Sequence, residues 1–183
     1  IASESSRMAT LVEDLLTLAR LDEGRPLEIT DIDLVKLADN AVFDLQALDP
    51  TRTVGLTGIS GRTPPMTLIV PGDRDRLSQV FTNLIGNIVR YTPEGSPVEI
   101  ALGRSGDTAI VELRDHGPGI DETDRGRVFE RFYRADSSRN RKSGGSGLGL
   151  AIVSGILAAH WGNASLTKTK GGGLTVRVEL PAT

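Results

Sequence analysis

Hydrophobic residues near the start of the chain recur at three- and four-residue steps, with charged residues between them. Over residues 4–21 this spacing predicts an amphipathic helix of coiled-coil type. Since no partner helix follows directly, we expect the apolar face to pair in a dimer or hairpin seam; packing against the same domain is the alternative. Gly24 and Pro26 end the helix and mark a domain boundary. The apolar positions are Met8, Leu11, Val12, Leu15, Leu16, Leu18 and Ala19.

The remainder of the chain mixes helical and strand patterns. Residues 34–47, 73–91 and 148–159 have the spacing or composition of helices, and a short helix is expected over 121–130. Strands are predicted over residues 27–30, 53–57, 66–70, 98–102, 108–113, 164–169 and 175–180. Because several strands follow one another as hairpins, the sequence predicts an α/β fold. We expect a two-layer sandwich, in which helices cover one face of a mixed, largely antiparallel sheet.

The composition narrows the class of protein. The chain of 183 residues has a formal net charge of −3 and no cysteine, so disulfides, thiolate zinc sites and thiol nucleophiles are excluded. This charge does not favour a nucleic acid as partner, and no apolar run approaches the roughly 20 residues of a bilayer span. Since the sequence begins with Ile1, we expect a piece of a longer protein whose membrane segments lie upstream.

Two asparagines on the helix predicted over 73–91 are four residues apart. Asn83 and Asn87 therefore project from the same face. An amide oxygen, phosphate oxygens and water together make a sufficient shell for Mg²⁺. Arg90 follows within a turn, where its guanidinium could meet phosphate, and the ring of Tyr91 could stack on a base. The alternative is a set of polar residues at the wet edge of a core helix.

A carboxylate stands at the mouth of a glycine turn further along. Asp115 follows the strand predicted over 108–113 and precedes Gly117 and Gly119. Such a carboxylate can accept a hydrogen bond from the amino group of adenine, while the glycines let a purine lie against the backbone. Guanine presents a carbonyl at that position, so the site would select adenine. The alternative is a turn-forming aspartate in an Asx motif.

A second glycine segment, Gly145, Gly147 and Gly149, leads into the helix predicted over 148–159. Backbone N–H groups at a helix start bind anions. The spacing is neither a Walker A sequence nor a dinucleotide-binding fingerprint, so a phosphate site of another kind is indicated. The preceding loop is basic and could close over a triphosphate, although a charge run is by default a solvated loop. Its cations are Arg134, Arg139, Arg141 and Lys142.

Together these segments resemble the sequence boxes of bacterial sensor histidine kinases. The asparagine box matches residues 83–93, the first glycine box 115–120, the phenylalanine box 128–134 and the second glycine box 145–150. Residues 7–16 are similar to the second helix of the family's dimerisation and phosphoacceptor domain. The resemblance implies the ATPase fold shared by histidine kinases and gyrase. Residues 1–24 would end the dimerisation domain, and residues 25–183 would form the catalytic, ATP-binding domain.

The resemblance also implies a role for each matching residue. Asn87 would coordinate Mg²⁺, and Asp115 would bind the adenine amine of ATP. Asn83 and Arg90 would lie at the phosphates and take part in catalysis. Further residues implied to contact the nucleotide are Arg90, Tyr91, Gly117, Gly119, Arg141, Lys142, Gly145, Gly147, Leu148 and Gly149.

For the activity, the resemblance implies transfer of the γ-phosphoryl group of ATP to a histidine and then to an aspartate of a response regulator. The protein would form a homodimer through its first helix, and the chain would be the cytoplasmic part of a membrane protein. His116 and His160 both lie outside that helix. We therefore expect the acceptor upstream, and we expect the chain to bind ATP without phosphorylating itself.

Three alternatives stay open. A hydrolase of the gyrase and chaperone type would carry a glutamate as general base where this chain has Asn83. A serine kinase of the anti-sigma-factor type would not be expected to have the leading helix. A non-catalytic nucleotide-binding or dimerisation module is supported only by Leu174, because the family often has Ser or Thr near this position.

Overall fold

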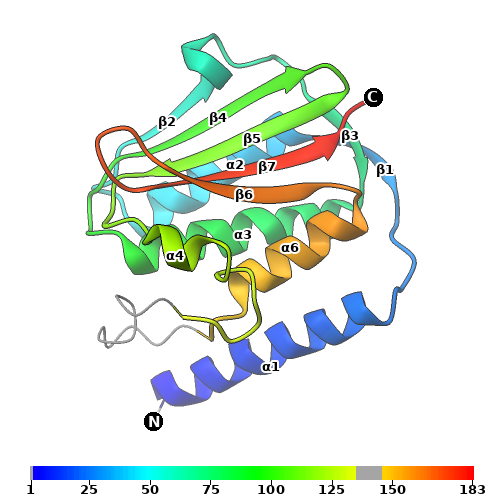
Figure 1. The fold of residues 1–183 in the computed structure, drawn as a ribbon, viewed down its shortest axis with the longest axis vertical. Helices are drawn as coiled ribbons and strands as arrows, with labels where there is room; N and C mark the ends of the chain where they lie inside the picture. Colours follow the sequence, from blue (N-terminus) through cyan, green and yellow to red (C-terminus); the bar gives the residue numbers. More distant parts are fainter. Residues whose placement is uncertain (1, 135–145) are drawn as a thin grey trace.

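The computed structural model describes residues 2–134 and 146–183, with side chains from Met8 onward. Figure 1 shows a sheet with helices on one of its faces. The sheet has the strand order β2-β4-β5-β7-β6, in which β2 and β4 are parallel and the other neighbours antiparallel. The predicted α/β sandwich with a mixed sheet is therefore confirmed. The strands are β2 (Val54–Gly58), β4 (Val98–Ser105), β5 (Thr108–Asp115), β6 (Asn163–Lys168) and β7 (Leu174–Pro181).

Within the described residues, three helices cover this face of the sheet: α2 (Leu34–Leu48), α3 (Arg74–Tyr91) and α6 (Gly149–Ala159). The carboxylate of Asp73 caps α3 by accepting from the N–H groups of Asp75 and Arg76. Because the buried residues of α3 follow helical spacing, its opposite edge is left for polar groups. The buried side chains of α3 are Leu77, Val80, Phe81, Leu84, Ile85 and Ile88.

Two short strands, β1 (Thr30–Asp33) and β3 (Ile69–Gly72), form a separate antiparallel sheet. Both begin later than predicted, at residue 30 instead of 27 and at residue 69 instead of 66. The predictions were wrong here because they counted exposed apolar residues as strand residues: Ile29 before β1 is 43% exposed, and Met66 before β3 is 95% exposed. Hydrogen bonds to the Asp33 carboxylate fix the junction instead, from the N–H groups of Val35 and Leu68.

The helix predicted over 121–130 is also corrected. α4 (Glu122–Arg125) is a single turn, and Gly126 follows it. Within 121–130 Val128 is the one buried side chain. A longer helix would have no apolar face to pack, and short helices are marginal without such packing.

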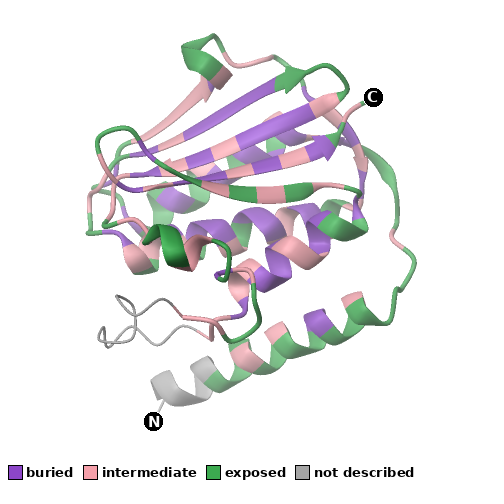
Figure 2. Ribbon diagram, in the orientation of Figure 1, coloured by how far each residue is buried: buried purple, intermediate pink, exposed green. Residues whose placement is uncertain are grey.

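The first helix, α1 (Ala2–Asp22), lies beside α6 (Figure 1). Its residue Leu18 is buried, and Leu21 reaches Gly155 of α6. Packing against the same domain is therefore found for one face. Figure 2 shows that much of the helix is exposed, so the expected dimer or hairpin seam stays a prediction for the other face. The exposed apolar residues are Met8, Val12, Leu15 and Leu16.

Among the described residues, no helix combines the length and hydrophobicity that crossing a membrane requires.

His160 has a structural role at the end of α6. Its buried ring lies with Nδ1 at 2.7 Å from the carbonyl oxygen of Ile156, and Nε2 accepts from the Asp73 N–H at 2.9 Å. The ring thus joins the end of α6 to the cap of α3. His116 is half-buried, and its Nε2 lies 3.8 Å from the Glu99 carboxylate.

The face of the sheet opposite the helices carries a ladder of charges. Glu112 on β5 accepts hydrogen bonds from Arg114 at 2.6 Å and from Arg177 on β7 at 2.8 Å. Arg114 also reaches Glu99 on β4 at 3.2 Å. Partial burial would raise the pKa of the Glu112 carboxyl. The hydrogen bonds from the two arginines outweigh this effect and lower that pKa below its ordinary value.

We expect Glu112→Gln to lower stability at neutral pH and to change little in acid. A carboxyl with a depressed folded pKa contributes stability above its unfolded pKa of about 4.3, and this is lost as the pH falls through the folded pKa. Because solvent screens this partly exposed network, the loss at neutral pH should be about 0.5–1 kcal/mol. Urea denaturation at neutral and acid pH measures it, with the exposed Glu94→Gln as control. An equal loss at both pH values would contradict the prediction.

Candidate nucleotide-binding site

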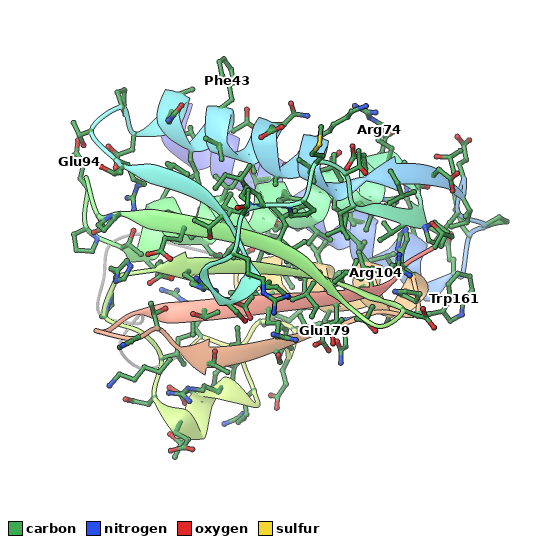
Figure 3. The ribbon with its side chains drawn as sticks, turned by 90° about the horizontal axis from the view of Figure 1, so that it is seen from above. Phe43, Arg74, Glu94, Arg104, Trp161 and Glu179 are labelled. Atoms are coloured by element: carbon green, nitrogen blue, oxygen red, sulfur yellow. The ribbon has the colours of Figure 1, made fainter. Side chains whose placement is uncertain are left out.

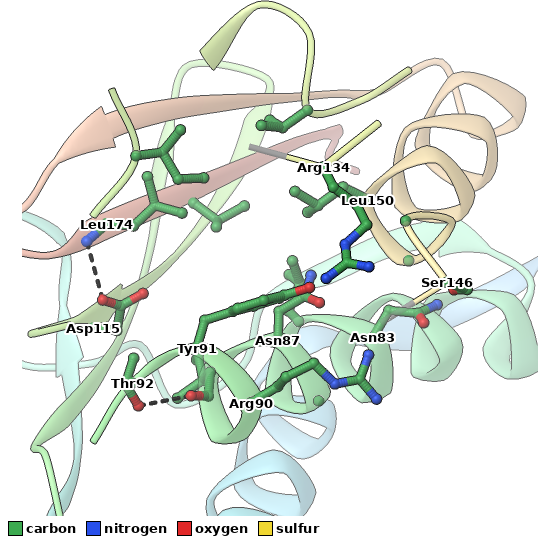
Figure 4. A pocket seen from close by; sticks show the side chains of 18 of the residues that line it. Asn83, Asn87, Arg90, Tyr91, Thr92, Asp115, Arg134, Ser146, Leu150 and Leu174 are labelled. Carbon is green, nitrogen blue, oxygen red and sulfur yellow. Dashed lines mark hydrogen bonds between the residues drawn. The ribbon is translucent and has the colours of Figure 1, made fainter. Parts of the chain in front are cut away.

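A cavity of about 570 Å³ opens along the polar edge of α3. Figure 4 shows how side chains from α3, from the end of β5 and from the segment before α6 converge around it. The fold thus brings the two glycine segments and the asparagine pair to one place. The predicted site residues that line the cavity are Asn83, Asn87, Arg90, Tyr91, Asp115, Gly119, Gly147 and Gly149.

Asp115, the last residue of β5, forms one wall of the cavity. Hydrogen bonds from two backbone N–H groups fix its side chain. Its Oδ1 accepts the backbone N–H groups of Gly117 at 2.9 Å and Leu174 at 3.1 Å. Within the described part of the chain, Oδ2 accepts no hydrogen bond. Figure 4 shows this second oxygen turned toward the cavity. The Asx turn considered from the sequence is therefore present, and it leaves the second carboxylate oxygen facing the cavity.

The backbone behind Asp115 is packed too closely for side chains. A Cβ on Gly117 would lie 2.8 Å from Cγ2 of Thr92, and one on Gly119 would lie 3.1 Å from the carbonyl oxygen of Gly173. Gly119 and Gly173 also have positive φ angles of 74° and 104°, which favour glycine. Gly117 does not itself line the cavity, and it acts through its hydrogen bond to Asp115.

The two asparagines face the start of α6. A Cβ built on Gly149 would lie 3.6 Å from Oδ1 of Asn83 and 3.7 Å from Oδ1 of Asn87. Since Gly149 has no Cβ, space remains beside both amide oxygens. Both side chains are half-buried, at the boundary between the core of α3 and the cavity. This geometry suits a site that takes an ion or a phosphate group between α3 and α6.

In the segment leading into α6, one predicted residue does not line the cavity. Leu148, predicted to contact the nucleotide, is fully buried in the core, and its N–H donates to Oγ of Ser146 at 3.2 Å. Gly147 does line the cavity; its φ of 72° and the carbonyl of Tyr133, 2.9 Å from a Cβ at this position, both require glycine. Three predicted residues, Arg141, Lys142 and Gly145, lie outside the described residues, as does Arg139.

Cations stand on two sides of the cavity. Arg90 is exposed on the last turn of α3, beside the half-buried ring of Tyr91. Arg134 points toward the space above Tyr91 and Asn87 in Figure 4. Both guanidinium groups can therefore meet the negative charge of a phosphate.

Helix α1 supplies a wall that the sequence did not predict. Thr10, Leu11 and Asp14 line the cavity, and Asp14 accepts a hydrogen bond from Ser146 at 3.0 Å. Partial burial raises the pKa of the Asp14 carboxyl, although the hydrogen bond from Ser146 and the charge of Arg90 act in the opposite direction. The heptad pattern gave no signal for this contact because Asp14 is polar and more than a hundred residues from Ser146 in sequence.

Sequence comparison assigns the chain that forms this site to a known family. Residues 72–183 match the model of the histidine kinase-, DNA gyrase B-, and HSP90-like ATPases. Among curated relatives, the probable sensor histidine kinase TcrY of Mycobacterium tuberculosis is 43% identical over 93% of this chain and 35% of its own length. The signal transduction histidine-protein kinase BaeS of Escherichia coli is 37% identical over 99% of this chain and 38% of its own length. The chain thus spans little more than a third of these relatives.

Comparison with solved structures supports the same family. Full-length ShkA, solved in complex with AMPPNP, has a TM-score of 0.81 and 29% identity over 98% of this chain and 37% of its own. The chain therefore belongs to the histidine kinase-, DNA gyrase B-, and HSP90-like ATPase family. The resemblance to sensor histidine kinases noted in the sequence is confirmed by the relatives it matches.

Proposed function

We propose that this chain is the catalytic, ATP-binding domain of a sensor histidine kinase. The observation that carries the proposal is the Asp115 carboxylate, which presents one oxygen to the cavity across from Asn83 and Asn87 (Figure 4). An acceptor at this point suits the amino group of adenine, and the amide and guanidinium groups suit the phosphates. The complex of ShkA with AMPPNP supports a nucleotide in this fold.

Mg²⁺ would be held by the Oδ1 of Asn87. Among the described residues, no group of three or more His, Cys, Asp or Glu side chains could hold a metal ion, so a metal here would rely on an amide oxygen, phosphate oxygens and water. Mg²⁺ accepts such a shell and keeps several waters. The space beside Asn87 that Gly149 leaves open fits this arrangement. When bound, the ion would neutralise phosphate charge.

Transfer to a protein histidine is favoured over hydrolysis by the residue one turn before Asn87. Asn83 is an amide and has no basicity to activate water. In the described part of the cavity wall the carboxylates are Asp14, on α1, and Asp115, at the end of β5, and neither stands one turn before Asn87 on α3. The γ-phosphoryl group would thus be kept for an acceptor histidine outside this chain and passed on to a response regulator.

The division into domains is part of the same proposal. Residues 1–24 would be the end of a dimerisation and phosphoacceptor domain, and residues 25–183 the catalytic domain. The exposed apolar side chains of α1, from Met8 to Leu16, support a homodimer through this helix.

The test is nucleotide binding and phosphoryl transfer by the chain itself. We expect ATP to bind more tightly with Mg²⁺ than without it and GTP to bind weakly, as isothermal titration would show. With γ-labelled ATP the isolated chain should remain unlabelled, because His160 is buried and His116 lies outside α1. Absence of ATP binding, or label on the chain, would overturn the assignment.

We expect Asn87→Ala to lower the affinity for ATP at least about tenfold when Mg²⁺ is present. The change removes the proposed metal ligand, so affinity without the metal should change much less. Isothermal titration with and without Mg²⁺ gives both values. Asn40→Ala, at an exposed position of α2, is the matched control and should leave both unchanged. An equal loss under the two conditions would argue against Asn87 as the ligand.

A further inference from the structure

A buried arginine outside the cavity is connected, through Thr92, to the cavity wall that Asp115 forms. Arg52 lies between α2 and β2, and its side chain is 1% exposed. Its guanidinium donates to the Asp49 carboxylate at 3.1 Å and to Oγ1 of Thr92 at 2.8 Å. It also donates to the carbonyl oxygens of Ser96 at 2.9 Å and Pro93 at 3.1 Å. One side chain therefore organises the whole turn that follows α3.

Asp49 extends this hold on the same turn. Its Oδ2, which accepts from Arg52, also accepts the N–H of Gly95 at 2.9 Å. Its Oδ1 accepts the Thr51 hydroxyl at 2.6 Å. Both charges are thus buried with their hydrogen-bonding capacity used, which is the condition under which a buried ion pair imposes one geometry.

Thr92 connects Arg52 to the backbone at the cavity wall. Besides accepting from Arg52, its hydroxyl donates to the carbonyl oxygen of Ile88 at 2.6 Å, so its rotamer is fixed from two sides. Its Cγ2 lies where a Cβ on Gly117 would approach to 2.8 Å, and Gly117 in turn donates to Asp115. A single side chain separates Arg52 from the backbone that orients the Asp115 carboxylate.

We infer that Arg52 is a positioning residue for base selection: it sets Thr92 against Gly117 and so holds Asp115 in the orientation that accepts from adenine. The inference rests on the proposed nucleotide site. A purely structural role would make Arg52 variants less stable and weaken every nucleotide alike. A positioning role changes the ratio of the affinities for ATP and GTP in protein that is fully folded.

Arg52→Lys tests this, because lysine keeps the charge for Asp49 but lacks the planar fork that reaches Thr92 and two carbonyls at once. We expect the ATP to GTP affinity ratio to fall about tenfold, the effect of disturbing one hydrogen bond to a charged group. Isothermal titration is performed below the melting temperature of each variant. Arg104, labelled in Figure 3, lies near the end of β4, whereas Arg52 binds Ser96 just before the start of that strand. Arg104→Lys is the matched control and should keep the ratio.

A second readout needs no nucleotide. In the unliganded protein the amide resonance of Gly117 should shift in Arg52→Lys and stay in place in Arg104→Lys. Thr92→Val, which removes the hydroxyl and keeps the methyl group against Gly117, should lower the ratio as Arg52→Lys does. The double variant should then lower the ATP to GTP affinity ratio little further than either single variant, because both changes break the same connection. If Arg52→Lys fails to fold, Thr92→Val decides the point.

The outcomes separate the two proposals. Wild-type chain that prefers ATP, with variants that keep both the ratio and the Gly117 resonance, would overturn the role of Arg52 and leave the nucleotide site intact. Wild-type chain that binds no ATP would overturn both.

Discussion

Asp115→Asn is expected to weaken ATP binding by about 10- to 150-fold, the loss of one hydrogen bond to a charged acceptor, and to shift the base preference toward guanine. The reason is the anchoring of the side chain. Oδ1 accepts from Gly117 and Leu174, and only the oxygen of an amide can replace it there. The NH₂ group of the new asparagine must therefore take the place of Oδ2 and face the cavity.

A donor at this position opposes the amino group of adenine and complements the carbonyl of guanine. Isothermal titration with ATP and GTP, each with Mg²⁺, measures the shift. Asp107→Asn, at a side chain 98% exposed in the β4–β5 turn, is the control for removal of a negative charge. Asp115→Ala is a poorer test, since it leaves the N–H groups of Gly117 and Leu174 without their acceptor. An asparagine variant with unchanged preference for ATP would show that the base lies elsewhere.

What the sequence predicted well is local. The helix carrying Asn83 and Asn87 follows from the spacing of its apolar residues, and the turn after β5 follows from Asp115 and its glycines. Each signal is contained within a few turns or strand residues, where periodicity and turn chemistry decide the structure. The convergence of these segments on one cavity was supplied by the family resemblance rather than by spacing.

What the sequence missed depends on contacts between distant segments. In the sequence, Arg52 has the pattern of an ordinary loop cation. In the structure it donates a hydrogen bond to Thr92, which lies 40 residues further along the chain. Gly173 reads as one of three turn glycines, yet it touches the backbone of Asp115. The pairing of Asp14 with Ser146 spans 132 positions. Such contacts follow from the assembled sheet and helices, so no local pattern encodes them.

Gly173→Ala is expected to destabilise the fold by about 3–5 kcal/mol, because overpacking and backbone strain each cost about 1–3 kcal/mol and both occur here. A Cβ at this position would lie 2.0 Å from the carbonyl oxygen of Asp115 and 2.8 Å from Cα of His116. These are backbone atoms of β5 and its turn, so they give way only if the end of the strand moves. The φ of 104° adds backbone strain for any residue with a Cβ.

Gly172→Ala separates these two causes. Gly172 has a similar φ of 115°, but a Cβ there would meet nothing within 4 Å among the described atoms. Gly172→Ala should therefore lower the free energy of unfolding only by the backbone strain, about 1–3 kcal/mol, and leave nucleotide affinity unchanged. Urea denaturation gives both free energies of unfolding, and titration with ATP below the melting temperature shows whether the Asp115 wall has moved. Equal losses in the two variants would mean that close packing against Asp115 contributes nothing, and that the strand end adapts freely to a side chain at Gly173.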